Sequence, residues 1–249
     1  MSLVKQLEKQ GNWLFRYRGQ LPLILFLLVI PVMFRQIDTN QGSLLTIIAI
    51  VVSFAGVVVR GYTIGTTPRG TSGRNTKQQV AESLNTSGIY STVRHPLYLG
   101  NYLMWIGIVI YTFDIGFVLF VSLLYWIYYE RIMMAEEGFL IGKFGQSYEN
   151  WASGVPAFIP SFKNFVSPST SFSLKSVFRR EYSGWLATVV GFAYVDFLRQ
   201  LFTNDYNFQL ASEAWWQYWR VILIVSVTIT LILRSLKHYT TLLKEEGRS

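Results

Sequence analysis

The chain has 249 residues, of which 51% are hydrophobic and only 14% are charged, and its mean hydropathy is +0.31. Soluble domains carry roughly 25% charged residues, so this composition indicates a membrane protein. The chain contains no cysteine, which excludes disulfides, thiolate catalysis and cysteine-bound metals. Its two histidines lie far apart in the sequence, which argues against a conventional zinc site.

The apolar segments predict an all-α, polytopic transmembrane bundle of about six spans. The expected spans are residues 21–34 (in a helix starting near Trp13), 44–64, 97–113, 115–134, 182–202 and 216–236. Residues 139–151 place aromatic and aliphatic side chains at helical spacing, which predicts an interfacial amphipathic helix after the fourth span. We divide the chain into three parts, residues 1–43, 44–160 and 161–249.

The distribution of basic residues predicts the topology. If the N-terminus lies in the cytoplasm and six spans alternate, 19 of the 22 Lys and Arg residues fall on the cytoplasmic side. Both termini are therefore expected in the cytoplasm, and the net charge of +8 reflects topology rather than nucleic-acid binding. We expect a multi-pass protein of a bacterial inner membrane, or of an endomembrane if the source is eukaryotic.

Residues 88–100 carry the pattern G-x-Y-x-x-x-R-H-P-x-Y-x-G. Pro96 suits the first turn of a helix, so Arg94 and His95 are expected at the N-terminal end of the third span. Free N–H groups and the helix dipole favour an anion there, and Gly100 would let a ligand approach the helix closely. The alternative interpretation is a charged juxtamembrane cap with an ordinary proline start.

The short connection between the third and fourth spans predicts which residues meet. At 1.5 Å per residue, about 18 residues up one helix and about 18 down the next return the chain to the same depth. Glu136 and Glu137 are thereby expected beside Arg94 and His95. Such a pocket suits a small zwitterionic or cationic cofactor better than a metal.

A second pattern, E-E-x-x-L-x-x-x-F-G-x-x-Y over residues 136–148 and then Val155-Pro156, completes a two-part motif. Together the halves resemble the integral-membrane S-adenosylmethionine-dependent methyltransferases, which include isoprenylcysteine carboxyl methyltransferases and phospholipid methyltransferases. The resemblance covers residues 44–160, which it implies are a methyltransferase core, and it implies S-adenosyl-L-methionine bound between the halves at the cytoplasmic face. It implies catalytic roles for Arg94, His95 and Glu137, and cofactor-binding roles for Tyr90, His95, Pro96, Tyr98, Leu99, Gly100, Glu136 and Glu137.

The expected reaction is methyl transfer to a lipid or lipid-anchored acceptor held in the bilayer, by O-methylation of a carboxylate or phosphate. In the loop of residues 66–77, Arg74 lies between Gly73 and Asn75, and freed N–H groups beside a guanidinium suit such an anion. We therefore predict that Arg74 binds substrate. The alternatives are a phospholipid N-methyltransferase and a catalytically silent membrane scaffold or carrier. The two spans after residue 160 depart from the familiar members and put the identity of the acceptor in doubt.

Two further groups of residues carry structural expectations. Asp196 lies inside the fifth span, and Arg199 follows one turn later, which favours a structural ion pair over a functional site. Tyr125, Trp126, Tyr128 and Tyr129 are expected to form an interfacial aromatic belt.

Overall fold

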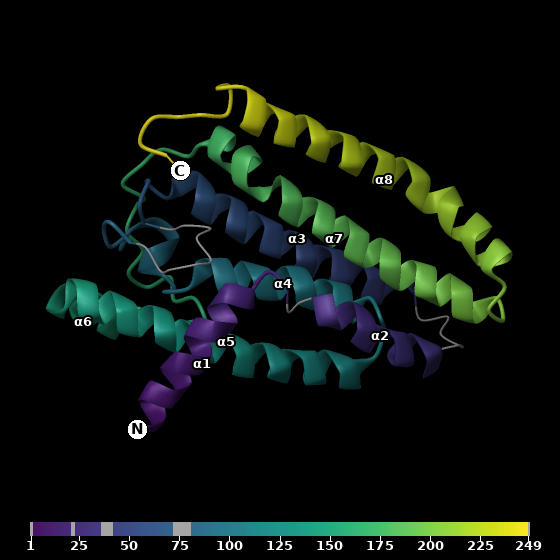
Figure 1. Ribbon diagram of the computed structural model, residues 1–249, viewed down its shortest axis with the longest axis horizontal. Coiled ribbons are helices and arrows are strands. Elements are labelled where there is room, and N and C mark those ends of the chain that lie inside the picture. The colour runs from purple at the N-terminus through teal and green to yellow at the C-terminus, as the bar shows by residue number, and fades with distance from the viewer. Residues whose placement is uncertain (1, 21–22, 36–41, 72–80, 249) are drawn as a thin grey trace.

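The computed structural model describes residues 2–20, 23–35, 42–71 and 81–248, and in these ranges the only regular secondary structure is helical (Figure 1). The all-α class is confirmed. The α-helices are α1 (Leu3–Tyr17), α2 (Ile24–Arg35), α3 (Gly42–Thr66), α4 (Pro96–Ile110), α5 (Ile115–Phe144), α6 (Gln146–Gly154), α7 (Leu174–Thr203) and α8 (Phe208–Tyr239), with a short 3-10 helix η2 (Gly88–Ser91) before α4.

Three helices of the described chain, α3, α5 and α8, are long and apolar enough to cross a membrane. The other predicted spans fall on α2, α4 and α7. The first two are apolar but have only 12 and 15 residues, so they rise about 18 and 22 Å against a hydrocarbon core of about 30 Å. Consecutive helices among these six alternate in direction along the bundle (Figure 1). The six-span count and the cytoplasmic orientation stay predictions.

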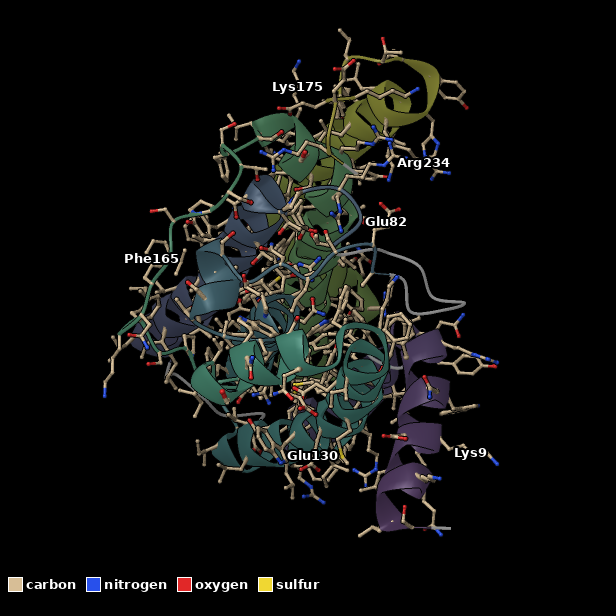
Figure 2. The ribbon with its side chains drawn as sticks, turned by 90° about the vertical axis from the view of Figure 1, so that its left-hand side faces the viewer. Lys9, Glu82, Glu130, Phe165, Lys175 and Arg234 are labelled. Carbon is tan, nitrogen blue, oxygen red and sulfur yellow. The ribbon has the colours of Figure 1, made fainter. Side chains whose placement is uncertain are left out.

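Both chain ends lie at the same end of the bundle, together with α6 (Figure 1). Figure 2 views this end, with Lys9, Lys175 and Arg234 at its periphery. These cations all belong to the set that the charge distribution assigns to the cytoplasm. On the side of the bundle away from α1 and α5, α8 packs on α7, and the two helices form a helical hairpin (Figure 1).

Two predicted helix boundaries are wrong. The first membrane helix does not start near Trp13, because residues 3–17 form the separate helix α1, which crosses α5 (Figure 1). No separate amphipathic helix begins at residue 139 either, because α5 continues without a break to Phe144. Gly145 then adopts φ +51°, a left-handed conformation that glycine tolerates, and α6 starts immediately after it.

Glycines allow α3 and α4 to pack at very short distance. A Cβ atom on Gly56 would lie 2.6 Å from the Gly100 carbonyl oxygen, and one on Gly107 would lie 2.6 Å from the Ala49 carbonyl oxygen. Between these contacts the Ser53 hydroxyl donates a hydrogen bond of 3.0 Å to the Met104 carbonyl. Small residues are the usual means of close helix packing in membranes, and this contact fixes α4 along the middle of α3.

The predicted pairing of Asp196 with Arg199 is confirmed. Arg199 Nη1 donates to Asp196 Oδ1 at 3.1 Å, and Trp219 Nε1 donates to Asp196 Oδ2 at 2.9 Å. The Tyr111 hydroxyl also donates to Asp196 Oδ1, at 3.1 Å. This cluster ties α7 to α8 and to the end of α4, so a structural role accounts for it.

Candidate functional site

The segment before α4 is held by backbone hydrogen bonds to the chain that follows α6. The Arg94 amide donates to the Pro156 carbonyl at 2.9 Å, and the His95 amide donates to the Ala157 carbonyl at 3.2 Å. In the other direction, the Ser161 amide donates to the Thr92 carbonyl at 2.9 Å. These bonds explain why Val155-Pro156 belongs to the motif, since this stretch fixes the backbone that carries Arg94 and His95.

The predicted constellation of two cations and two carboxylates is present. Arg94 forms a fork with Glu137, with Nε to Oε1 at 2.9 Å and Nη2 to Oε2 at 3.3 Å. His95 Nε2 lies 2.8 Å from the same Oε1, and His95 Nδ1 lies 3.4 Å from Glu136 Oε2. Arg94 Nη1 also donates to the Ala152 and Val155 carbonyls, each at 2.9 Å. The residues that the length of the two helices predicts to meet are therefore in contact in the structure.

His95 is buried and has a carboxylate next to each ring nitrogen. Burial lowers the pKa of His95, but the hydrogen bonds and charges of Glu136 and Glu137 outweigh this effect and raise the pKa above its ordinary value. The His95 ring is thus held between two carboxylates, one beside each ring nitrogen.

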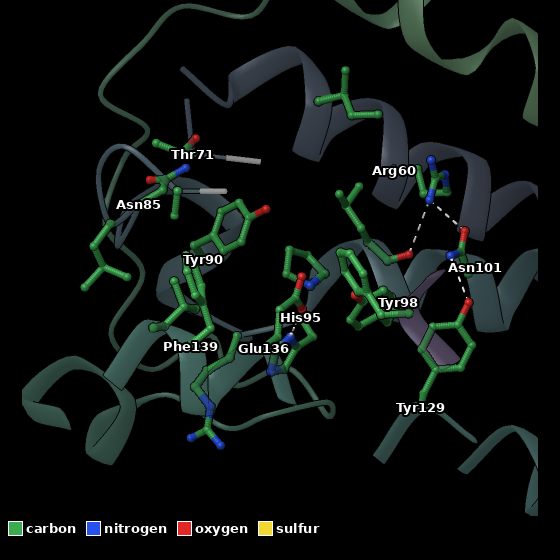
Figure 3. A pocket seen from close by; sticks show the side chains of 18 of the residues that line it. Arg60, Thr71, Asn85, Tyr90, His95, Tyr98, Asn101, Tyr129, Glu136 and Phe139 are labelled. Carbon is green, nitrogen blue, oxygen red and sulfur yellow. Dashed lines mark hydrogen bonds and ion pairs between the residues drawn. The ribbon is translucent and has the colours of Figure 1, made fainter. Parts of the chain in front are cut away.

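Beside this cluster lies a cavity of about 380 Å³, a volume within the range of small-molecule sites. The first turn of α4, through Pro96, Leu97 and Tyr98, forms part of its wall, so the helix N-terminus faces the space (Figure 3). Glu136 and Phe139 of α5 face it as well. The N-terminal part contributes Phe15 and Arg18, and the C-terminal part contributes Arg180, so all three predicted parts of the chain meet here.

Six of the residues expected at the site line this cavity: Tyr90, Arg94, His95, Pro96, Tyr98 and Glu136. Glu137 is not in its wall and lies behind Arg94 and His95 as their shared acceptor. Leu99 is outside the wall too. Arg74 lies outside the described residues, so its predicted role in substrate binding stays a prediction.

Gly100 faces α3 in the structure, so its expected role in letting a ligand approach α4 stays a prediction. Gly100 does not line the cavity, and a Cβ atom there would lie 2.4 Å from Arg60 Cγ and 3.1 Å from the Gly56 carbonyl oxygen. The glycine therefore serves the close approach of α3 and α4. The sequence shows that something must come close at this position, but the rotation of the helix decides that it is another helix.

Sequence reasoning missed a second polar group at the inner end of the cavity. Arg60 Nε and Nη2 donate to the two carboxylate oxygens of Glu181, each at 2.7 Å, and Nη1 donates to Asn101 Oδ1 at 2.6 Å. The Asn101 amide in turn donates to the Tyr129 hydroxyl at 3.3 Å. Figure 3 shows Arg60, Asn101 and Tyr129 together at this end. An arginine inside an otherwise apolar helix was the available signal, since such residues mark functional sites by default.

Only some of the four aromatic residues expected in an interfacial belt face outward. Trp126 is exposed, but Tyr129 is buried and lines the cavity. The Tyr125 hydroxyl donates to the Tyr98 carbonyl at 2.6 Å, and the rings of Tyr125 and Tyr129 stack at 4.1 Å between centroids. Two of the four aromatics therefore turn inward, Tyr129 as part of the cavity wall and Tyr125 stacked against it.

Tyr148 of α6 provides a donor that the protein itself leaves unused. Its side chain is buried and borders the cavity, and its hydroxyl makes no hydrogen bond within the described chain. Burial and the negative charge of Glu137 raise the pKa of Tyr148, so the hydroxyl keeps its proton. The hydroxyl is thus a buried donor at the edge of the cavity, within the influence of the Glu137 carboxylate.

The family comparison covers this cavity's central elements. Residues 40–147 match the sequence model of the family described as phospholipid methyltransferase. The match covers less than half of the chain. The resemblance to integral-membrane methyltransferases that the two-part motif indicates is confirmed. α7 and α8 lie beyond the matched segment.

Two curated relatives match parts of the chain. A protein-S-isoprenylcysteine O-methyltransferase of Schizosaccharomyces pombe is 36% identical over 77 residues, which are 31% of this chain and 33% of the relative. A nickel-cobalt-cadmium resistance protein, NccN, of Alcaligenes xylosoxydans xylosoxydans is 31% identical over 99 residues, 40% of this chain and 44% of the relative. The chain thus aligns with less than half the length of either relative. No solved structure gives a significant match.

The residues around the cavity fit S-adenosylmethionine. Glu136 presents a carboxylate that suits an ammonium group or ribose hydroxyls. The N-terminus of α4 suits a carboxylate. The unpartnered Tyr148 hydroxyl supplies a further buried donor.

Proposed function

We propose that this protein transfers a methyl group from S-adenosylmethionine to a lipophilic acceptor, at the end of the bundle that the charge distribution assigns to the cytoplasm. The acceptor atom in this proposal is an anionic oxygen of a carboxylate or a phosphate. The observation that carries the proposal is the cavity itself, where a family-matched segment brings Arg94, His95 and Glu136 around one ligand-sized space.

The charges of the cavity wall favour an anionic acceptor. Among the described residues that line it are four arginines, Arg18, Arg60, Arg94 and Arg180, whereas Glu136 is the acidic one. S-adenosylmethionine with a zwitterionic amino acid part adds a further net positive charge. An ammonium acceptor would meet more cationic than anionic groups in the wall, while a carboxylate or phosphate would be attracted.

The protonation of the site favours the same class of acceptor. N-methylation of an ammonium group requires loss of a proton first, and that needs a base in the cavity. His95 presents its ring nitrogens to Glu137 and Glu136 rather than to an acceptor amine. A carboxylate or phosphate oxygen already carries its lone pairs and negative charge at neutral pH.

The chain's own residues then have positioning roles. Glu136 and the α4 N-terminus would hold the two ends of the amino acid part, while Glu137, itself bonded to Arg94, keeps the His95 ring in place. When bound, the cofactor supplies an electrophilic methyl group, so an O–C bond forms as the S–C bond breaks and the charges of oxygen and sulfonium cancel. Holding the two reactants in line in a water-poor cavity supplies much of the rate.

Methyl transfer to total membrane lipid tests this proposal. Purified protein in detergent is given S-adenosylmethionine with a labelled methyl group and a lipid extract, and the labelled product is identified. A base-labile methyl ester or a methyl phosphodiester supports the proposal. A labelled N-methyl amine would instead establish the phospholipid N-methyltransferase alternative. Absence of saturable cofactor binding would establish the silent scaffold or carrier.

A further inference from the structure

The arginine at the inner end of the cavity is fixed by a helix outside the family-matched segment. Glu181 of α7 holds Arg60 of α3 through two parallel bonds of 2.7 Å. The Glu181 side chain is 0% exposed, whereas that of Arg60 is 15% exposed and lines the cavity. The carboxylate therefore stands behind the wall and turns the guanidinium toward the space.

The stability of the fold does not explain this pair. A buried Arg–Glu pair contributes little net stability, because desolvation offsets its attraction, and apolar residues of similar volume do as well or better. An intramembrane ionisable residue beside a cavity is a functional candidate. The pair is therefore best explained by what Arg60 contacts in the cavity.

A second arginine of the cavity wall lies next to Glu181 in the chain. Arg180 immediately precedes Glu181 on α7, is 7% exposed, and lines the same cavity. Arg60 Nη1 donates to Asn101 and to the Leu97 carbonyl, whereas Nη2 carries a second N–H besides the one that Glu181 accepts. Two guanidinium groups thus line the cavity from neighbouring helices, and Figure 3 shows that of Arg60 at the end remote from Tyr90 and Thr71.

On the basis of the proposed function, we propose that α7 builds the acceptor subsite: Arg60 and Arg180 bind the anionic group of the acceptor, and Glu181 is the positioning residue that orients Arg60. Guanidinium groups bind carboxylate and phosphate oxygens alike, with fork geometry. The C-terminal helix pair would then determine which acceptor the family core methylates. This subsite lies apart from Glu136, so the cofactor keeps its own contacts.

The test measures acceptor binding apart from turnover. Purified protein in detergent is saturated with S-adenosylhomocysteine, and equilibrium binding of two labelled probes is measured. The probes are N-acetyl-S-farnesylcysteine, which carries a carboxylate, and dioleoyl phosphatidic acid, which carries a phosphate. The probe that wild-type protein binds more tightly identifies the source of the anion.

Three variants address the subsite. Glu181→Gln and Arg180→Gln should each raise the Kd of that probe about tenfold or more, while the Kd of S-adenosylhomocysteine stays within about twofold of wild type. Since Glu181→Gln leaves the Arg60 charge buried without its partner, a double variant, Arg60→Met with Glu181→Leu, removes both charges at similar volume and keeps the fold. It should lose probe binding to the same extent.

The matched control is Arg179→Gln. Arg179 precedes Arg180 and does not line the cavity, so the variant should bind both ligands as wild type does. Unchanged probe binding in the folded double variant would overturn the inference, and so would a parallel rise in the Kd of S-adenosylhomocysteine. Wild-type protein that binds neither probe would overturn it too. Wild-type protein that binds a probe but transfers no methyl group would instead refute the proposed function.

Discussion

Replacing Glu137 by Gln tests the central constellation, because this carboxylate is the shared acceptor of Arg94 and His95. It accepts three bonds of 2.8, 2.9 and 3.3 Å, and its side chain is 23% exposed. A glutamine retains one acceptor oxygen, and its NH₂ group would face cations. Charge-assisted bonds contribute about 1.5–3 kcal/mol each, and partial exposure reduces this, so we expect a loss of about 2 kcal/mol in the energy that holds Arg94 and His95 in place.

That loss corresponds to a factor of about 30 in an equilibrium constant. Isothermal titration of S-adenosylmethionine into the detergent-solubilised variant should therefore show a Kd raised about 30-fold, and kcat/KM for methyl transfer should fall by at least as much. Glu130→Gln is the matched control, since Glu130 lies on the same helix and points outward (Figure 2). Near-normal cofactor binding and activity in a folded Glu137→Gln protein would refute the assignment of the site.

The remaining predictions concern pH, packing, the acceptor and topology. Burial lowers the pKa of His95, but Glu136 and Glu137 raise it by more, so the folded-state pKa lies above the unfolded value. The stability that His95 contributes is therefore complete below about pH 6.5 and is lost as the pH rises through the folded-state pKa. The unfolding temperature should fall over that range, and His95→Gln should flatten this pH profile. Gly100→Leu should lower the unfolding temperature along with cofactor binding, through the clash with α3; lost binding at an unchanged unfolding temperature would return Gly100 to the cofactor site. Arg74→Ala should raise the acceptor KM or lower kcat with cofactor affinity nearly unchanged, with partial rescue by Arg74→Lys, and normal turnover would exclude that role. In this cysteine-free chain, Lys163→Cys should react with impermeant maleimide only from the cytoplasmic side and Asp205→Cys only from the other; labelling of both from one side would contradict the six-span topology.

The local part of the site was predictable from the sequence. Arg94, His95 and Pro96 are adjacent, and a tight turn at Asp114, whose side chain caps α5 with a bond of 2.8 Å, fixes how far the chain travels before Glu137. Residues related by one helical hairpin meet at a depth that the helical rise determines. No knowledge of side-chain packing was needed for that step.

The contacts that the sequence did not reveal depend on packing between distant elements. Arg60 and Glu181 are 121 positions apart, and nothing in the periodicity of either helix indicates that they meet. The prediction joins α1 to the first span, although α1 is a separate helix. The place of α1 against α5 depends on Gly11, where a Cβ atom would lie 2.0 Å from the Arg131 carbonyl oxygen, and such a contact is not visible in the local sequence. Such contacts are properties of the assembled bundle and leave no local signal.

The cavity obtains its positive character from ion pairs that are neutral as pairs. Arg94 and Arg60 both line the space, while their partners Glu137 and Glu181 stand behind the wall. A ligand in the cavity is closer to the two guanidinium groups than to the carboxylates, so it experiences the cationic half of each pair. The same arrangement limits the desolvation penalty of the empty site, since each arginine keeps a bonded carboxylate when no anion is present.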